Sequence, residues 1–137
     1  MDSGEAGALT RGRKLRFSRM SGSFTICRVA AGTAIPAWAM EGSFYSVSST
    51  PDELSIVCAQ EHVPSEVRCE SEWACLKLEG PFPFSETGIL SSFVQPLAES
   101  AIPIFAIATF ETDYVLVKLV SLEKALQALK DAGHQEI

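Results

Sequence analysis

The second half of the chain alternates between strand-like apolar runs and helix-like apolar spacing. The run 73–78 ends at Gly80 and Pro81, which is typical of a buried strand before a loop. The runs at the two ends of 104–117 flank a short polar link, Thr109 to Asp113, and predict a hairpin of two buried strands. Two amphipathic helices are predicted from apolar positions on one face: 89, 90, 93, 94 and 97 in the first, and 122, 125, 126 and 129 in the second.

The ends of these helices also have sequence signals. Ser85 or Thr87 is a candidate cap for the first helix and Ser121 for the second, which Gly133 would end. The resulting order is β-α-β-β-α, one strand short of a ferredoxin-like βαββαβ unit. Residues 134–137 are too few for a convincing last strand, so that edge must come from elsewhere or stay open.

The first half reads as a worn copy of the second. It holds strand-like runs at 24–29, 44–47 and 54–58, a turn at 49–53, and a short helix at 63–67 with Pro64 near its start. We therefore expect an α+β fold of two ferredoxin-like halves, 21–70 and 71–137. The first is degenerate, and the halves share or exchange edge strands.

Charge is distributed unevenly over the 137 residues. The whole chain carries −6, but residues 1–19 hold five basic residues against two acidic ones, which leaves −9 on the remainder. An acidic body argues against nucleic-acid binding, and no apolar run is long enough for a membrane helix. Residues 1–20 are expected to be a disordered basic tail, a targeting arm, or an extension ahead of a true start at Met20. Without a secretory signal, a cytoplasmic protein is expected.

Cysteine and histidine give no sign of a metal or catalytic centre. None of the four cysteines forms a C-x-x-C pair, and three of them (Cys27, Cys58 and Cys75) lie in apolar runs, where cysteine packs as a small hydrophobe. Cys58, His62, Cys69 and Cys75 do not have the spacing of a usual zinc site. No nucleophile elbow, P-loop or zinc-protease motif occurs, and His62 and His134 are expected at the surface. We expect neither an enzyme nor a cofactor.

Several residues could form a ligand pocket. Free backbone N–H groups near Thr87 would suit a carboxylate, and Gly88 would let it approach. Glu86 and Asp113 could hold an ammonium group, and Phe110 could lie against an aliphatic stem or a guanidinium. Each residue also has a purely structural interpretation: Glu86 as a helix-dipole partner, Gly88 in close packing, Asp113 with Thr112 in the hairpin, and Phe110 in the core.

Four segments of the second half resemble CASTOR-type ACT domains, a family that includes an animal arginine sensor. They are Glu79–Phe82, Glu86–Leu90, Gln95–Ala98 and Ile102–Val117, within a match over roughly residues 73–132. The first half, including 23–25 and 53–57, resembles the companion half of small bacterial members.

The resemblance implies a βαββαβ ACT fold that binds an amino-acid effector at an interface between ACT units. Carried over to this chain, it assigns ligand contacts to Glu86, Thr87, Gly88, Ile89, Thr109, Phe110 and Asp113. The acidic body mildly favours arginine or another cationic amino acid, and pairing of two chains would form a homodimer. The alternative is a structural ACT homodimer that binds no ligand.

Overall fold

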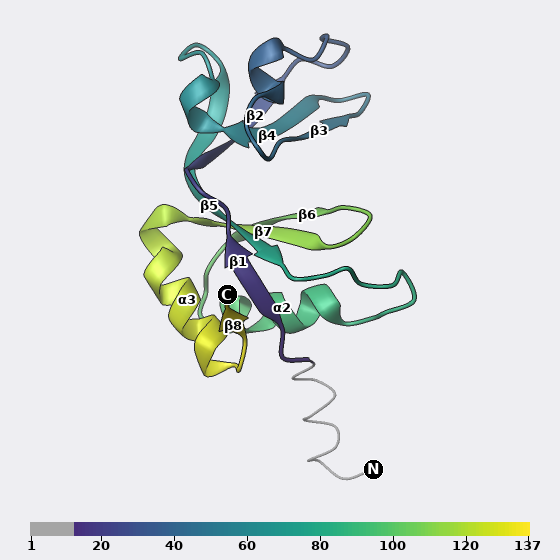
Figure 1. Cartoon of the computed structure of the whole chain (residues 1–137). Helices are drawn as coiled ribbons and strands as arrows, with labels where there is room; N and C mark the ends of the chain where they lie inside the picture. The colour runs from purple at the N-terminus through teal and green to yellow at the C-terminus, as the bar shows by residue number, and fades with distance from the viewer. Residues whose placement is uncertain (1–12) are drawn as a thin grey trace. The chain divides into compact units, whose positions relative to one another are not determined.

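The computed structural model describes residues 13–137, which divide into two compact units. Unit 1 contains the described residues up to Met20 together with 75–137, and unit 2 contains 21–74. Strand β5 (Arg68–Leu78) runs through both units, so its first part pairs in unit 2 and its last part in unit 1 (Figure 1).

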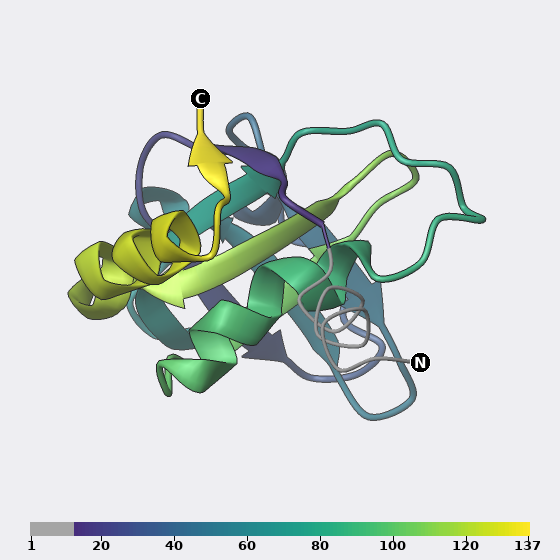
Figure 2. The same ribbon diagram turned by 90° about the horizontal axis from the view of Figure 1, so that it is seen from below.

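Unit 1 is a sheet of strand order β8-β1-β5-β7-β6 with two helices on one face. Strands β1 (Arg16–Arg19), β6 (Ile104–Ala108), β7 (Asp113–Lys118) and β8 (Gln135–Glu136) join the end of β5. β1 pairs antiparallel with β5 and parallel with β8, and β6 and β7 form an antiparallel hairpin. Helices α2 (Ile89–Glu99) and α3 (Leu122–Asp131), the latter after the 3₁₀ turn η3 (Leu119–Ser121), lie next to each other on that face (Figures 1 and 2).

The structure confirms the predicted elements of unit 1 and supplies the missing edge. β8 is a strand of only two residues, and β1 is inserted between it and β5. The expectation of a tail through residue 20 is therefore wrong for 16–19, and its part in residues 1–12 lies outside the described residues. Arg19, at the end of the strand, pairs with Glu136 at 3.1 Å. Leu15 and Phe17 are buried, whereas Arg16 between them is exposed and pairs with Glu79 at 3.3 Å. This alternation of buried and exposed positions is that of a strand. The sequence analysis did not predict the strand, because it is short and surrounded by basic residues.

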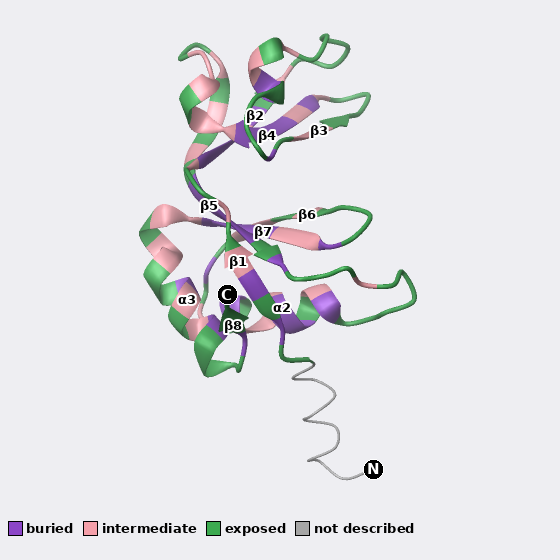
Figure 3. Ribbon diagram, in the orientation of Figure 1, coloured by how far each residue is buried: buried purple, intermediate pink, exposed green. Residues whose placement is uncertain are grey.

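The core of unit 1 lies between the helices and the sheet (Figure 3). Phe17 of β1 contacts Phe93 of α2 edge to face, with ring centroids 5.3 Å apart. Leu97, Leu116 and Leu129 bring α2, β7 and α3 into the same apolar interior, where none of them is exposed. Strand β1 thus contributes a large aromatic side chain to the core of a domain that otherwise begins some 60 residues later.

Unit 2 has the same order of elements with its helices reduced to turns. Strands β2 (Phe24–Val29), β3 (Ser46–Ser49) and β4 (Leu54–Ala59) pair with the start of β5 in the order β3-β4-β2-β5. The 3₁₀ turns η1 (Ala37–Met40) and η2 (Gln60–His62) stand where a ferredoxin-like unit has helices. The predicted helix at 63–67 is wrong, because that segment is a turn closed by Val67 N–H on Pro64 O. The fold is α+β with two ferredoxin-like halves, the first degenerate.

A small apolar cluster holds unit 2 together. Its buried members are Cys27, Ala39, Leu54, Ile56 and Cys58. Cys27 and Cys58 pack there as the small hydrophobes that their apolar runs predict, and Cys75 is equally buried in unit 1. Burial raises the pKa of the Cys75 thiol to about 12, so this thiol is protonated and unreactive at neutral pH.

We expect Phe17→Ala to lower the free energy of unfolding by about 3–5 kcal/mol, because it removes a buried aromatic ring and leaves a cavity. Urea titration measures the change. Phe84→Ala is the matched control, because Phe84 is 75% exposed and should cost less than about 1.5 kcal/mol. Equal losses in the two variants would mean that β1 is not part of the core.

Candidate functional site

Helix α2 begins with a bare backbone. Gly88 precedes it in the left-handed conformation, with φ of 78°, and no side chain caps the helix. The capping predicted for Ser85 or Thr87 is therefore wrong. The hydroxyls of Ser91 and Ser92 instead donate to the carbonyl of Gly88. The first N–H groups of a helix have no partner within it, so they are available to an anion.

The predicted site residues at this helix start differ in exposure. Glu86 pairs with Arg13, with Nη1 and Oε1 2.7 Å apart and both side chains partly exposed. Thr87 and Gly88 are exposed. Ile89 is only 6% exposed, so its side chain belongs to the core and its backbone is what a ligand could reach.

The tip of the β6–β7 hairpin is built by its threonines. The Thr109 backbone N–H and hydroxyl both donate to Thr112 O at 2.9 Å, and the buried Thr112 hydroxyl donates to Leu78 O at 2.8 Å. Phe110 is 77% exposed, so the interpretation that it is a core residue is wrong. Asp113 is half-buried, and desolvation raises the pKa of its carboxyl group.

The loop between β5 and α2 lies beside this hairpin tip, and both extend to the same side of unit 1 (Figures 1 and 2). Phe84 and Phe110 meet edge to face at 4.7 Å, and Phe82 N–H donates to Glu111 O at 2.9 Å. Gly80, Pro81, Glu111 and Thr112 line part of a hollow of about 210 Å³. The structure thus brings Phe110 to the loop, whereas Glu86 forms an ion pair with Arg13.

His134 is a functional candidate that the sequence analysis missed. It is 5% exposed, so the prediction of a surface position is wrong. Its Nδ1 accepts the Leu15 N–H at 3.0 Å, which leaves the proton on Nε2, and Nε2 donates to Ser92 O at 3.0 Å. Pro96 stands four residues after Ser92 in α2 and has no N–H, so this carbonyl lacks its helical partner. A proline inside a predicted helix was the signal that another donor was needed.

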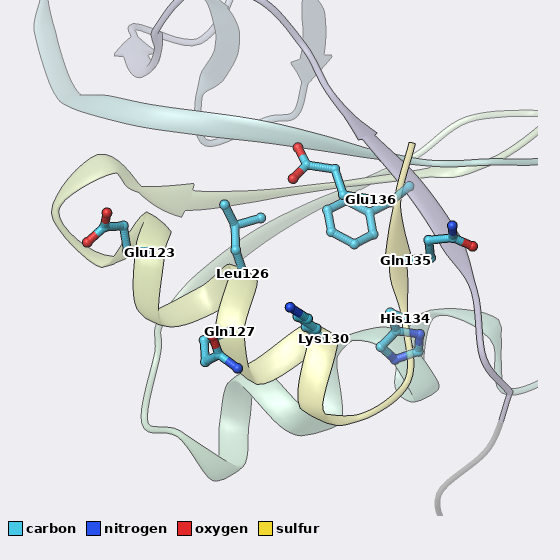
Figure 4. Close-up of a pocket in the computed structure, with 8 residues that line it drawn as sticks. Glu123, Leu126, Gln127, Lys130, His134, Gln135 and Glu136 are labelled. Atoms are coloured by element: carbon cyan, nitrogen blue, oxygen red, sulfur yellow. The ribbon is translucent and has the colours of Figure 1, made fainter.

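A separate hollow of about 600 Å³ lies between α3 and β8 (Figure 4). Helix α3 contributes Glu123, Leu126, Gln127 and Lys130 to its lining, and the segment His134–Glu136 lies opposite (Figure 4). Phe17 of β1 also lines the hollow. None of the predicted site residues lines it.

In residues 13–137, no group of three or more His, Cys, Asp or Glu side chains is arranged to hold a metal ion. No helix in the same residues has the length and apolar character to cross a membrane.

Comparison with protein families agrees with this fold and with the element order. Residues 68–131 match the family model described as an ACT domain, and residues 22–66 match a second model described as an N-terminal domain. The chain is an ACT-domain protein. ACT domains are typically non-catalytic regulatory modules that bind small molecules, generally amino acids, and oligomerise.

This ACT-domain protein is similar to three relatives with known names. It is 43% identical to the solved structure of protein Atu0741 from Agrobacterium tumefaciens, covering 92% of this chain and 94% of that one, with a TM-score of 0.87. It is 30% identical to human CASTOR3P over 87 residues, 54% of this chain, and spans about half (53%) of that relative's length. The regulatory subunit of aspartate kinase from Thermus thermophilus shares the fold at 13% identity, with coverage of 85% and 96% and a TM-score of 0.57.

Burial of His134 makes stability depend on pH. Desolvation lowers the pKa of the folded imidazole, whereas an unfolded histidine titrates near pH 6.5. The unfolded chain therefore binds more protons, and the free energy of unfolding should fall as the pH drops below about 6.5 and level off below the folded pKa. His134→Gln should be less stable at neutral pH but have a flatter dependence, measured by urea titration between about pH 7 and pH 5. An equally steep slope in the variant would contradict this.

Proposed function

We propose that this ACT-domain protein is a non-catalytic module that binds an amino acid and reports its occupancy by a change in association. The observation that carries the proposal is the start of α2 in an ACT domain: a left-handed glycine, no side-chain cap, and a carboxylate two residues before that glycine. The proposed ligand residues are those that the sequence resemblance assigns: Glu86, Thr87, Gly88, Ile89, Thr109, Phe110 and Asp113.

The helix start supports binding of the ligand's α-carboxylate. The N–H groups of the first turn have no partner within the helix, and the helix dipole adds partial positive charge there. Gly88 has φ of 78°, which a residue with a Cβ adopts only with strain, and its lack of a side chain leaves the backbone open. α2 has 11 residues, which is long enough for this dipole to form.

Acidic and aromatic groups nearby support a cationic ligand. Glu86 already holds a guanidinium group, that of Arg13, so its carboxylate is accessible to such a cation. Phe110 is exposed and could lie against an aliphatic stem or a guanidinium plane. The net charge of −6 would attract cations from solution. Arginine or another cationic amino acid is therefore the proposed ligand.

A second copy of the chain is proposed to complete the pocket. The start of α2 is exposed in the single chain, and ACT domains generally oligomerise. A homodimer in the cytoplasm, with the ligand held between ACT units, would turn binding into a change in association. The output would then pass to a partner protein.

Thermal denaturation against each of the twenty amino acids tests the proposal, because a ligand of the native state raises stability. We expect a cationic amino acid to raise the Tm, and Glu86→Gln to weaken its binding about tenfold through loss of a charge-assisted hydrogen bond. Glu79→Gln is the matched control, because Glu79 also pairs with an arginine, Arg16 at 3.3 Å, but is not a proposed ligand residue. If none of the twenty amino acids raises the Tm at millimolar concentration, the proposal is contradicted.

The exposed pair of Phe84 and Phe110 favours a second candidate, a structural homodimer without a ligand. Two aromatic rings with about three quarters of their surface exposed are typical of an interface. In that case Phe110→Ser should weaken self-association measured by sedimentation velocity over a range of concentrations, and amino acids should leave the dimer unchanged. The exposed Val120→Ser is the control, and an unchanged dimer in Phe110→Ser would exclude this role for the pair.

A further inference from the structure

Residues 13–15, here called the arm, lie against the start of α2. The Arg13 guanidinium is 2.7 Å from the Glu86 carboxylate, and its backbone N–H donates to the Ser92 hydroxyl at 3.0 Å. The same hydroxyl donates to Gly88 O. The arm therefore contacts the first turn of α2 through both its backbone and its charge.

Only the first part of the arm is free to leave. Leu15 is buried, its N–H is held by His134, and its carbonyl accepts from Gln135 N–H at 2.9 Å. The Lys14 stem lies so close to Gly133 that an added Cβ there would approach its Cε to 2.9 Å. By contrast, the Arg13 and Glu86 side chains are 48% and 34% exposed, and exposed ion pairs are weak and sensitive to salt.

We propose that Arg13 is a built-in competitor for the amino-acid site. Its guanidinium occupies Glu86, so docking of the arm and binding of a cationic amino acid at Glu86 exclude each other. This rests on the proposed function, since Glu86 must be a ligand residue. Two cationic groups on one exposed carboxylate would repel each other.

The competition lowers the apparent affinity of the site. Only molecules with the arm displaced can use Glu86 for a ligand, so the apparent Kd rises in proportion to the docked fraction. In return, a cationic amino acid releases Arg13 while Leu15 stays anchored. Occupancy of the site is thereby converted into movement of Arg13.

Calorimetric titration of the full chain with L-arginine tests this. We expect Arg13→Gln to bind L-arginine roughly two- to five-fold more tightly than wild type, the range of an exposed ion pair. Arg16→Gln is the matched control, because it breaks the Arg16–Glu79 pair, which includes no proposed ligand residue, and its affinity should equal that of wild type. Equal affinities of Arg13→Gln and wild type would overturn the competition and leave the proposed function intact.

Hydrogen exchange of the Arg13 amide, followed by NMR, reports docking without reference to any ligand. Glu86→Gln should speed this exchange in the ligand-free protein, and L-arginine should speed it in wild type more than potassium chloride of equal ionic strength. An Arg13 amide that exchanges equally fast in wild type and Glu86→Gln would overturn arm docking. Absence of L-arginine binding to both wild type and Arg13→Gln would overturn arginine as the ligand, and with it the competition.

Discussion

The imidazole of His134 is the contact on which unit 1 depends. Through His134, three segments that are far apart in the chain are joined. The imidazole accepts from Leu15 N–H, in the approach to β1, and donates to Ser92 O in helix α2. The backbone N–H of His134 donates to Leu129 O at the end of α3. A buried polar group without a partner is costly, and within the described residues no buried side-chain nitrogen or oxygen lacks one. Pro96 creates the unpaired carbonyl, and His134 satisfies it.

This network also explains how β1 comes to fill the sheet. A ferredoxin-like unit would place its last strand directly beside its first, but β8 has only two residues. Inserting β1 between β5 and β8 covers that edge and brings Phe17 over Phe93. Strand β1, which completes the core, follows directly after the arm in the chain. The arm, residues 13–15, therefore connects the proposed ligand site to the edge of the sheet.

The candidate site was predictable only where local sequence decides local structure. The helix near residue 89 and the 109–113 link could be located, since periodicity and turn composition act within a few residues. The capping prediction failed because the residue that precedes the helix is Gly88, which has no side chain to accept from the first N–H groups. Exposure of Phe110 was not predictable either, because an aromatic residue at a strand end suits core and surface equally, and its partner Phe84 lies in a different loop.

The sequence by itself determined the order of strands and helices and the apolar face of each, since these follow from spacing along the chain. It also set the end of α3 at Gly133, whose φ of 93° favours glycine. Only the tertiary structure decided that residues 16–19 are a core strand and that His134 is buried. Those outcomes depend on partners such as Leu15 and His134, which are 119 residues apart, and a local pattern carries no information about which distant group will satisfy a buried polar atom.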